Sequence, residues 1–392
     1  MVTRTFVQYL ERYWQGPALE ITVAGKNYRL GQGTPQTTII IHRPFAWRRA
    51  APSLAFGEAY MRGDVEIIGN LLDILQGYYQ TNAILAASRQ AWVAKWWHHR
   101  RQEISTRRAL GYARHHYDIS NEFYRLWLDP LLVYSCAYFL GPEDSLAAAQ
   151  QQKLELLCRK LRLEPGQSLL DIGCGWGALL FHAATRYNTR VTGITAAIEQ
   201  ARYIRAEIKR RDLQDQIQII VGDWRKLTGK YDRVVSVGMF EHVGQAQYPL
   251  FFKRWRGLLH DHGLSLLHTI GRMQIGMPDS WIRKYIFPGG YLPTLAELAE
   301  HMGEQHLRIM DVENLRQHYA LTLHAWSRNF QAVSDQVVRM YNEEFVRMWW
   351  LYLQGSEAAF RWGGLNLWQV VMTPKESTAW PLNREVETAH LG

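Results

Sequence analysis

Short apolar runs alternate with helix-length segments from residue 165 onward. The helical segments are expected at about 177–187, 197–211 and 246–260. This alternation predicts an α/β fold, a doubly wound parallel sheet with helices on both faces. The predicted strands are "SLLDI" (168–172), "RVTGI" (190–194), "IQIIV" (217–221), "RVVSV" (233–237) and "LSLLHTI" (264–270).

The C-terminal part continues with helices and one more strand. Helices are expected at about 318–333 and 340–360. They precede "LNLWQVVM" (365–372), whose apolar and β-rich composition predicts a last strand. We expect this strand to close the sheet at an edge.

The first hundred residues show shorter and more varied elements. Residues 5–14 have an amphipathic pattern that predicts a short helix. The stretch "ALEITVAGKNYRLGQG" predicts two strands around a turn at 25–27, and "TTIIIH" (37–42) predicts a third strand. A helix is expected near 71–85. Together these elements predict a small α+β domain.

The length of the chain and the distribution of its charge both indicate two domains. Because 392 residues exceed the usual size of one hydrophobic core, we expect a smaller domain at 1–105 and a larger domain at 106–392. Residues 1–110 hold fourteen Lys or Arg against seven Asp or Glu, which is +7 of the total net charge of +9. This excess predicts contact with a polyanion, either nucleic acid or an anionic lipid surface. The segment "WVAKWWHHRR" (92–101) suits an interfacial element or a solvated linker helix equally well.

The composition is that of a globular protein, with 47% hydrophobic and 21% charged residues. Its three cysteines, Cys136, Cys158 and Cys174, are far apart and include no CxxC pair, so neither a disulfide framework nor a thiolate zinc site is expected. The N-terminus lacks the apolar run of a signal peptide, and no 18 consecutive residues are apolar. We therefore expect a cytoplasmic protein that at most rests on a membrane surface.

The first predicted strand of the large domain ends in a glycine-rich turn, "LLDIGCGWG". Asp171 stands at the strand end, and Gly173, Gly175 and Gly177 follow it. Glycines there let a ligand approach the main chain and expose backbone N–H groups at the start of the next helix. The spacing is one residue shorter than the GxGxxG of dinucleotide sites, and an acid suits a ligand's amino group better than a pyrophosphate. Both features favour S-adenosylmethionine over NAD; the alternative is a tight turn that binds nothing.

Five separated motifs, in this order, make the sequence resemble the cyclopropane-fatty-acyl-phospholipid synthases, relatives of the mycolic acid cyclopropane synthases. The resemblance runs from about residue 112 to residue 372 and is looser over residues 1–100, where "AFGEAYMRGD" is the best anchor. It implies a class I methyltransferase-like seven-stranded sheet. The motifs are "YSCAYF" (134–139), "LDIGCGWG" (170–177), "VGMFEHVG" (237–244), "LLHTIG" (266–271) and "WIRKYIFPGG" (281–290).

The resemblance implies a reaction on lipid. The methyl group of S-adenosylmethionine is attacked by the π-electrons of a cis double bond in a phospholipid acyl chain, and proton loss from the resulting cation closes a cyclopropane ring. In the family, a bound bicarbonate ion is the base that removes this proton. The matching residues are Glu241, which would accept a hydrogen bond from bicarbonate, His268, which would donate one, the Tyr319 hydroxyl, and the backbone groups of Cys136 and Ile270.

The same resemblance assigns residues to the cofactor and to the walls of the site. Thr195 ends the second strand, where many adenosylmethionine enzymes place an acid, and the family shares this departure. The cofactor residues are Tyr134 and Ser135 near the methionine portion, Asp171 at the amino group, Gly173 and Gly175 beneath it, Thr195 and Gln200 near the ribose, and Asp223 and Trp224 at the adenine. Candidate aromatic walls are Tyr134, Tyr138, Phe139, Tyr285 and Phe287.

The resemblance also implies partners. It suggests an unsaturated phospholipid substrate, a lipid-docking N-terminal domain, peripheral attachment to the inner face of the cell membrane, and a homodimer. No metal is expected.

Alternatives remain open. A lipid methyltransferase on this scaffold would give methyl-branched or methylene chains instead of rings. Methylation of a nucleic acid or a small polar nucleophile is less favoured, because neither an NPPY-like tetrad nor a basic-aromatic RNA module is present. A lipid-binding protein without activity is disfavoured by the intact Asp171, Glu241 and His268. The alternative interpretation of Glu241 and His268 is that they have a structural role only and cap strand ends. His242 is assigned no direct role.

Overall fold

The computed structural model describes residues 7, 10–45, 52–87, 120–375 and 380. They belong to two compact units. The small unit comprises Met1–Gln102, Pro278–Pro288 and Leu323–Gly364. The large unit comprises Glu103–Met277, Gly289–Thr322 and Leu365–Gly392.

The two units are not consecutive halves of the chain. The small unit takes the segments 278–288 and 323–364 in addition to the N-terminal part of the chain. The predicted boundary after residue 105 lies outside the described residues and stays a prediction. The separate docking and catalytic roles given to the two domains stay predictions. The segment 92–101 lies outside the described residues. Of the predicted helix at 5–14, residues 5, 6, 8 and 9 also lie outside them, whereas residues 7 and 10–13 are helical.

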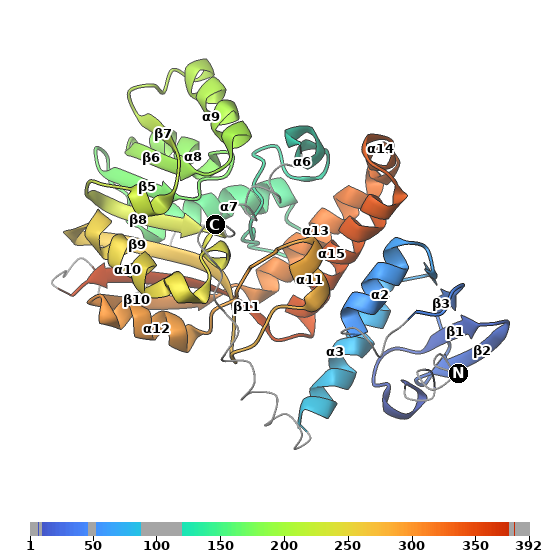
Figure 1. Cartoon of the computed structure of the whole chain (residues 1–392). Coiled ribbons are helices and arrows are strands. Elements are labelled where there is room, and N and C mark those ends of the chain that lie inside the picture. Colours follow the sequence, from blue (N-terminus) through green and yellow to red (C-terminus); the bar gives the residue numbers. More distant parts are fainter. Residues whose placement is uncertain (1–6, 8–9, 46–51, 88–119, 376–379, 381–392) are drawn as a thin grey trace. The chain divides into compact units, whose positions relative to one another are not determined.

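The small unit contains a four-stranded sheet of β1 (Leu19–Val23), β2 (Lys26–Leu30), β3 (Thr37–Ile41) and β4 (Val65–Ile68) (Figure 1). The strand order is β2-β1-β3-β4, and β1 pairs antiparallel with β2 but parallel with β3. Ala24 and Gly25 join β1 to β2 with left-handed φ angles of 50° and 72°. The turn therefore lies one position earlier than expected, since Lys26 already pairs within the hairpin.

Helices complete the small unit: α2 (Pro52–Met61), α3 (Leu71–Ala87), α11 (Ser280–Tyr285), α14 (Ser334–Met340) and α15 (Glu343–Arg361). α15 packs on α2 and α3, and α11 packs on α2. The Trp281 Nε1 of α11 donates to Met61 Sδ of α2 at 3.3 Å. The Arg347 Nη1 of α15 donates to the backbone oxygen of Tyr60 at 3.3 Å. These contacts explain why segments far along the chain belong to this unit.

The large unit is built on a seven-stranded sheet, which confirms the predicted α/β fold (Figure 1). Its strands are β5 (Ser168–Ile172), β6 (Arg190–Thr195), β7 (Ile217–Val221), β8 (Tyr231–Val237), β9 (Leu259–Arg272), β10 (Leu307–Asn314) and β11 (Leu365–Pro374). The order is β10-β11-β9-β8-β5-β6-β7. The strands from β5 to β9 pair in parallel, whereas β11 is antiparallel to both β9 and β10.

Helices cover both faces of this sheet. The helices are α6 (Asn121–Trp127), α7 (Leu146–Lys160), α8 (Ala178–Tyr187), α9 (Ile198–Arg210), α10 (Tyr248–Leu258), α12 (Leu295–Glu304) and α13 (Arg316–Ala332), the last of which crosses from the large unit into the small one. One apolar core joins α7, α8 and α9 to the sheet, and another joins α10 and α12 to it. Leu169 and Leu170 of β5 enter different cores because successive strand residues face opposite sides.

The expectation that 365–372 forms an edge strand is wrong. β11 lies between β9 and β10, and the edge is β10. The β10 sequence "LRIMDVEN" mixes charged and apolar residues and was not predicted as a strand, because one of its sides lacks a partner strand. Within the described residues, no helix is both long and apolar enough to cross a membrane.

Candidate functional site

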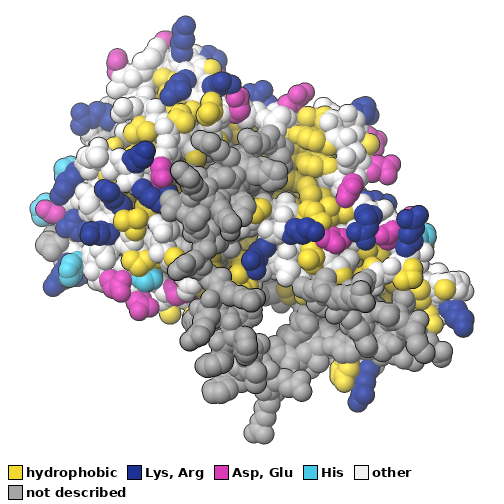
Figure 2. Space-filling model, in the orientation of Figure 1, with side chains coloured by type: hydrophobic (Ala, Val, Ile, Leu, Met, Phe, Trp, Pro, Cys, Tyr) yellow, Lys and Arg dark blue, Asp and Glu magenta, His cyan; other side chains and the backbone are white. Residues whose placement is uncertain are grey.

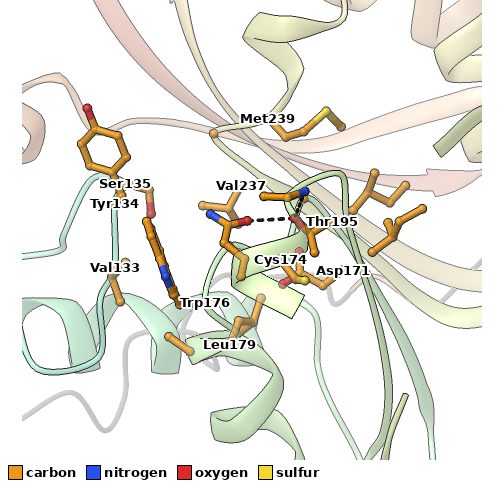
Figure 3. Close-up of a pocket in the computed structure, with 18 of the residues that line it drawn as sticks. Val133, Tyr134, Ser135, Asp171, Cys174, Trp176, Leu179, Thr195, Val237 and Met239 are labelled. Carbon is orange, nitrogen blue, oxygen red and sulfur yellow. Dashed lines mark hydrogen bonds between the residues drawn. The ribbon is translucent and has the colours of Figure 1, made fainter. Parts of the chain in front are cut away.

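A cavity lies at the carboxyl ends of β5, β6 and β8 (Figure 3). In doubly wound sheets this is the side on which ligands bind. The wall is formed by the three strand ends, by the loop 132–135 that follows α6, and by Lys153 of α7. In Figure 3, Trp176 stands on the side of Tyr134 and Ser135, and Thr195 and Asp171 lie across from it.

The glycine-rich turn after β5 keeps side chains away from the cavity. Gly173 has a φ of 91°, and a Cβ there would lie 2.6 Å from the Cβ of Met239. Gly177 precedes α8 in the left-handed region and offers no side chain to its first turn. The backbone N–H groups at this helix start can therefore face a ligand.

A buried acid and a buried base share the floor of the cavity. Asp171 is 3% exposed and Lys153 is 2% exposed. Burial raises the pKa of Asp171 to about 7, against the opposing charge of Lys153. Burial also lowers the pKa of Lys153 to about 8, although Asp129 and other neighbours oppose it. Asp171 Oδ1 has no hydrogen-bond partner among the described residues, so this carboxyl group can receive a cationic ligand.

Lys153 and Gln150 hold the loop that carries the predicted methionine-side residues. Lys153 Nζ donates to Ser135 Oγ at 3.1 Å, and Gln150 Nε2 donates to the backbone oxygen of Ser135 at 2.9 Å. The two donors are three residues apart and so lie on one face of α7. The position of the loop is thus set from within the core.

Thr195 and Gln200 meet at the end of β6. Thr195 Oγ1 donates to Gln200 Oε1 at 2.8 Å and accepts from the Ala197 backbone nitrogen at 3.1 Å, as the dashed lines in Figure 3 show. Because the Gln200 oxygen is used by Thr195, its amide nitrogen is the end that can donate to a ligand hydroxyl.

Eight of the nine predicted cofactor residues line this cavity: Tyr134, Ser135, Asp171, Gly173, Gly175, Thr195, Gln200 and Trp224. Asp223 does not line it. Its carboxylate accepts from the Arg225 backbone nitrogen at 3.0 Å and from Arg225 Nη1 at 2.8 Å, so it is occupied by its own turn.

Sequence reasoning missed several lining residues. Lys153 lies on the apolar face of α7 with Leu154 and Leu157, where a lysine would ordinarily be taken as solvated. Trp176 stands inside the quoted glycine motif but carried no assignment. His242 also lines the cavity, and burial lowers its pKa to about 4, so its ring is neutral at physiological pH.

A second group of polar residues forms where β8 and β9 run side by side. Glu241 lies in the 3-10 turn η2 (Phe240–His242) directly after β8 and is 8% exposed. Its Oε1 accepts from the Ile270 backbone nitrogen at 2.6 Å. His268 pairs with Val237 across the two strands and is 1% exposed. The structure thus brings Glu241 to the strand that carries His268 and Ile270.

Two buried atoms in this group have no hydrogen-bond partner among the described residues: Glu241 Oε2 and His268 Nε2. Burial raises the pKa of Glu241 to about 7, although the hydrogen bond from the Ile270 amide opposes it. Burial, followed by the charges of Lys153 and Lys160, lowers the pKa of His268 well below its ordinary range. Buried polar atoms are rarely left unpaired, so a ligand with both a donor and an acceptor fits here.

Cys136 and Tyr319 both contact the backbone oxygen of Leu315. The Cys136 Sγ lies 4.0 Å from the backbone oxygen of Leu315, and the Tyr319 backbone nitrogen donates to that oxygen at 3.1 Å. Leu315 is in turn bonded through its nitrogen to the backbone oxygen of Leu367 at 2.8 Å. Leu367 of β11 is the cross-strand partner of Ile270 of β9. Through Leu315, Cys136 and Tyr319 are therefore linked to β11, the strand next to β9.

The predicted aromatic residues are divided between the two units. Tyr138 stacks on His318 at 4.5 Å between ring centroids in the large unit. Tyr285 and Phe287 belong to the small unit, where the Tyr285 hydroxyl donates to Glu58 at 3.0 Å and Phe287 packs on Tyr352. Within the described residues, no cluster of His, Cys, Asp or Glu could hold a metal ion.

Comparison with known families gives a match over residues 104–370 to the family described as mycolic acid cyclopropane synthetase. The chain belongs to this family. A second match, at residues 12–89, is to a domain of unknown function.

Two curated relatives are similar to this cyclopropane synthetase family member. A probable fatty acid methyltransferase of Pseudomonas putida is 38% identical over 358 residues, which cover 88% of this chain and 89% of the relative. The cyclopropane-fatty-acyl-phospholipid synthase of Escherichia coli K12 is 40% identical over 270 residues, which cover 69% of each chain.

Two solved structures support the same placement. The cyclopropane synthase MmaA2 of Mycobacterium tuberculosis superposes with a TM-score of 0.64 at 32% identity, covering 67% of this chain and 97% of that one. The mycolic acid cyclopropane synthase CmaA1, complexed with SAH and CTAB, gives 0.64 at 35% identity with the same coverage. This member of the cyclopropane synthetase family therefore has the fold of an S-adenosylmethionine-dependent methyltransferase, and it is an enzyme of that class.

Proposed function

We propose that the protein transfers the methyl group of S-adenosylmethionine to the cis double bond of a phospholipid acyl chain, and that loss of a proton then closes a cyclopropane ring. Membership of the family and the identity to the Escherichia coli synthase support this reaction. The observation that carries it is the pair of buried unpartnered atoms, Glu241 Oε2 in the turn η2 and His268 Nε2 on β9. The turn follows the end of β8, which forms part of the cavity wall.

We call the cavity at the ends of β5, β6 and β8 the cofactor pocket. S-adenosylmethionine would supply an electrophilic methyl group on a positively charged sulfur. Asp171 fits its ammonium group, because a buried carboxylate without a partner is stabilised by a cation. The Gln200 amide, oriented by Thr195, fits a ribose hydroxyl. Trp224 fits the adenine ring, whereas the Asp223 carboxylate is taken by Arg225.

We call the group formed by Cys136, Glu241, His268, Ile270 and Tyr319 the base site. Bicarbonate bound there would supply a small base for the proton that is lost. The residues fit such an ion: Glu241 Oε2 can accept from its hydroxyl, and His268 Nε2 can donate to its oxygen. The Ile270 N–H holds Glu241 Oε1, so a contact of Ile270 with the ion would be made by its carbonyl oxygen.

Three residues of the base site are shielded from water by burial, and Ile270 and Tyr319 are partly buried. Glu241, His268 and Cys136 are all buried, and β8 and β9, which lead to Glu241 and carry His268, lie between two apolar cores. A carbocation formed in such a place is protected from attack by water, which would give an alcohol instead of a ring.

The phospholipid substrate and membrane attachment are part of the same proposal. They rest on the resemblance and on the basic excess of residues 1–110, nine of whose fourteen Lys and Arg lie outside the described residues. On the face shown in Figure 2, described Lys and Arg side chains are spread among other types and are not gathered in one patch. Each basic group near an anionic leaflet contributes roughly 1 kcal/mol. The homodimer rests on the resemblance alone.

A second candidate is a lipid methyltransferase that gives methyl-branched or methylene acyl chains. The observation that favours it is the Pseudomonas putida relative, a probable fatty acid methyltransferase that aligns with 88% of this chain. The two candidates share the cofactor pocket and differ only in the fate of the cation. Ring closure and the methylene product both release a proton, so the base site suits either; the identity to the Escherichia coli cyclopropane synthase supports ring closure.

The test is to incubate the protein with S-adenosylmethionine and unsaturated phospholipid vesicles and to analyse the acyl chains by mass spectrometry. We expect a gain of one CH2 unit together with loss of the double bond. A gain of CH2 with the double bond retained would favour the methylene product, and no gain would refute both candidates. Parallel reactions in carbonate-free buffer and in added bicarbonate test the base, and anionic and neutral vesicles at low and high salt test the charge argument.

A further inference from the structure

A row of buried polar side chains lies behind His268. Lys160, in the last turn of α7, forms an ion pair with Glu313 of β10. Lys160 Nζ also donates to Gln369 Oε1 of β11 at 2.7 Å. Gln369 Nε2 lies 3.0 Å from His268 Nδ1. Lys160, Gln369 and His268 are each at most 2% exposed, so water does not compete for these bonds.

The donor and acceptor properties of the groups fix the direction of each hydrogen bond in this row. A lysine ammonium only donates, so the oxygen of the Gln369 amide must face Lys160. The amide nitrogen must then face His268, and it also only donates. His268 Nδ1 is therefore the acceptor and carries no proton. A neutral imidazole in this arrangement carries its proton on Nε2.

The unpaired His268 Nε2 atom indicates that a ligand binds here. It is buried and has no hydrogen-bond partner among the described residues, and the same is true of Glu241 Oε2. Burial, Lys153 and Lys160 all lower the pKa of His268, which keeps the ring neutral. Two lysines near the ring also favour an anion over a cation at Nε2.

We propose that Lys160 and Gln369 are positioning residues that hold His268 as the neutral Nε2–H tautomer, so that His268 is a fixed hydrogen-bond donor to the anion of the base site and does not accept the proton itself. This inference rests on the proposed function for the identity of the anion. It goes beyond that function by assigning two residues outside the site and by excluding His268 as the base. Glu313 acts one step further away, by pairing with Lys160.

The decisive measurement is the tautomer of His268 in the wild-type protein without ligands. Selective 15N labelling of the 15 histidines gives long-range 1H–15N spectra that distinguish a protonated from an unprotonated ring nitrogen, and loss of one pattern in His268→Gln assigns the residue. We expect protonated Nε2 and bare Nδ1 at pH 7. A proton on Nδ1, or on both nitrogens, would overturn the proposal whatever the activity.

Gln369→Glu tests the positioning. A carboxylate at 369 accepts from His268 Nδ1, so we expect the proton to move to Nδ1 and ring formation to fall about 10- to 100-fold, with KM for S-adenosylmethionine unchanged. Asn366→Asp is the matched control: it also places a carboxylate on β11, three residues away on the opposite face, where Asn366 Oδ1 accepts from Asn314. It should change neither the tautomer nor turnover.

The outcomes separate the inference from the proposed function. If wild type carries Nε2–H but yields no modified lipid, the proposed function fails and the tautomer assignment stands. If rings form while Gln369→Glu retains both Nε2–H and full turnover, the positioning role fails and the function stands. Should Gln369→Glu not fold, Lys160→Met serves instead: the amide loses its anchor, and we expect a mixture of tautomers and lower turnover.

Discussion

The cofactor pocket and the base site each contain one buried acid whose pKa is raised to about 7, yet the two acids have different neighbours. Asp171 faces Lys153, and one of its oxygens is unpartnered. Glu241 receives the Ile270 N–H on one oxygen and has no lysine among the groups that shift its pKa. In both carboxyl groups burial outweighs the neighbours that lower the pKa, and the resulting pKa is similar.

The neighbours decide what each acid can do. An acid beside a lysine stays ionisable at neutral pH and can attract the ammonium of a ligand. An acid fixed by one backbone amide keeps a defined orientation, so its free oxygen can orient a small ion. The difference predicts that variants of the two sites separate binding from turnover.

The largest effect is expected from Glu241→Gln. The amide can still accept from the Ile270 nitrogen, but it places a donor where Oε2 would accept from the ion. We expect kcat to fall about 10²- to 10⁴-fold, while Kd for S-adenosylmethionine changes less than about twofold. Product formation and calorimetric binding measure the two quantities. Glu207→Gln, on the surface of α9, is the matched control, and normal turnover by the Glu241 variant would reject the base site.

The second largest effect is expected on the affinity for S-adenosylmethionine. Asp171→Asn removes the charge that we propose meets the ligand ammonium, so we expect Kd for S-adenosylmethionine to rise about 10- to 100-fold, the range of a charged hydrogen bond. At saturating ligand, kcat should stay within a few-fold of wild type. Asp223→Asn is the control, because Arg225 already occupies that carboxylate. Equal losses of affinity in both variants would contradict the placement of the ligand.

Local patterns predicted the strands well because a buried parallel strand is a short apolar run with a defined end. The same ends revealed Asp171, the next-to-last residue of β5, and Glu241, in the turn η2 that follows β8. Strand order was not predictable, since "LNLWQVVM" reads alike at an edge or inside the sheet, and β11 is inside. β10 was missed because half of its positions are polar or charged.

The supporting residues could not be found from sequence. Lys153 and Lys160 lie on a helix whose lysines would ordinarily be solvated, and Gln369 is one polar residue in an apolar strand. Their importance arises from contacts across 101 to 209 residues of chain, such as those of Gln369 with His268 and Lys160. Such contacts exist only in the folded sheet.

The affinity for S-adenosylmethionine should also depend on pH, and Lys153 should set the pH at which the affinity levels off. Asp171 has a pKa of about 7 in the empty pocket and binds a cation best when ionised, so affinity should rise about tenfold per pH unit up to pH 7 and then level off. Lys153→Met removes the charge that opposes the raised pKa, which moves the levelling to higher pH. His242, with a pKa of about 4, stays neutral throughout.

Calorimetric Kd values between pH 5 and pH 8 check this prediction. The ligand's own titration is the same for every variant and cancels in the comparison. Lys209→Met, at an exposed position of α9, should follow the wild-type curve. Asp171→Asn should be nearly independent of pH, and a slope equal to that of wild type would show that another group governs binding.

The smallest effect is expected from Thr195→Val. The hydroxyl orients the Gln200 amide at 2.8 Å and accepts from the Ala197 nitrogen, so its loss leaves the amide free to rotate and one backbone donor unpaired. A hydrogen bond of this kind contributes about 0.5–1.5 kcal/mol, which corresponds to a rise in Kd for S-adenosylmethionine of about 2- to 10-fold without a change in kcat. Thr185→Val removes a comparable hydroxyl, bonded to the Phe181 oxygen at 2.8 Å on α8, and should leave Kd unchanged. If Thr195→Val lowered kcat instead, the end of β6 would act on the reaction itself, and the separation of binding from turnover between the two sites would not hold.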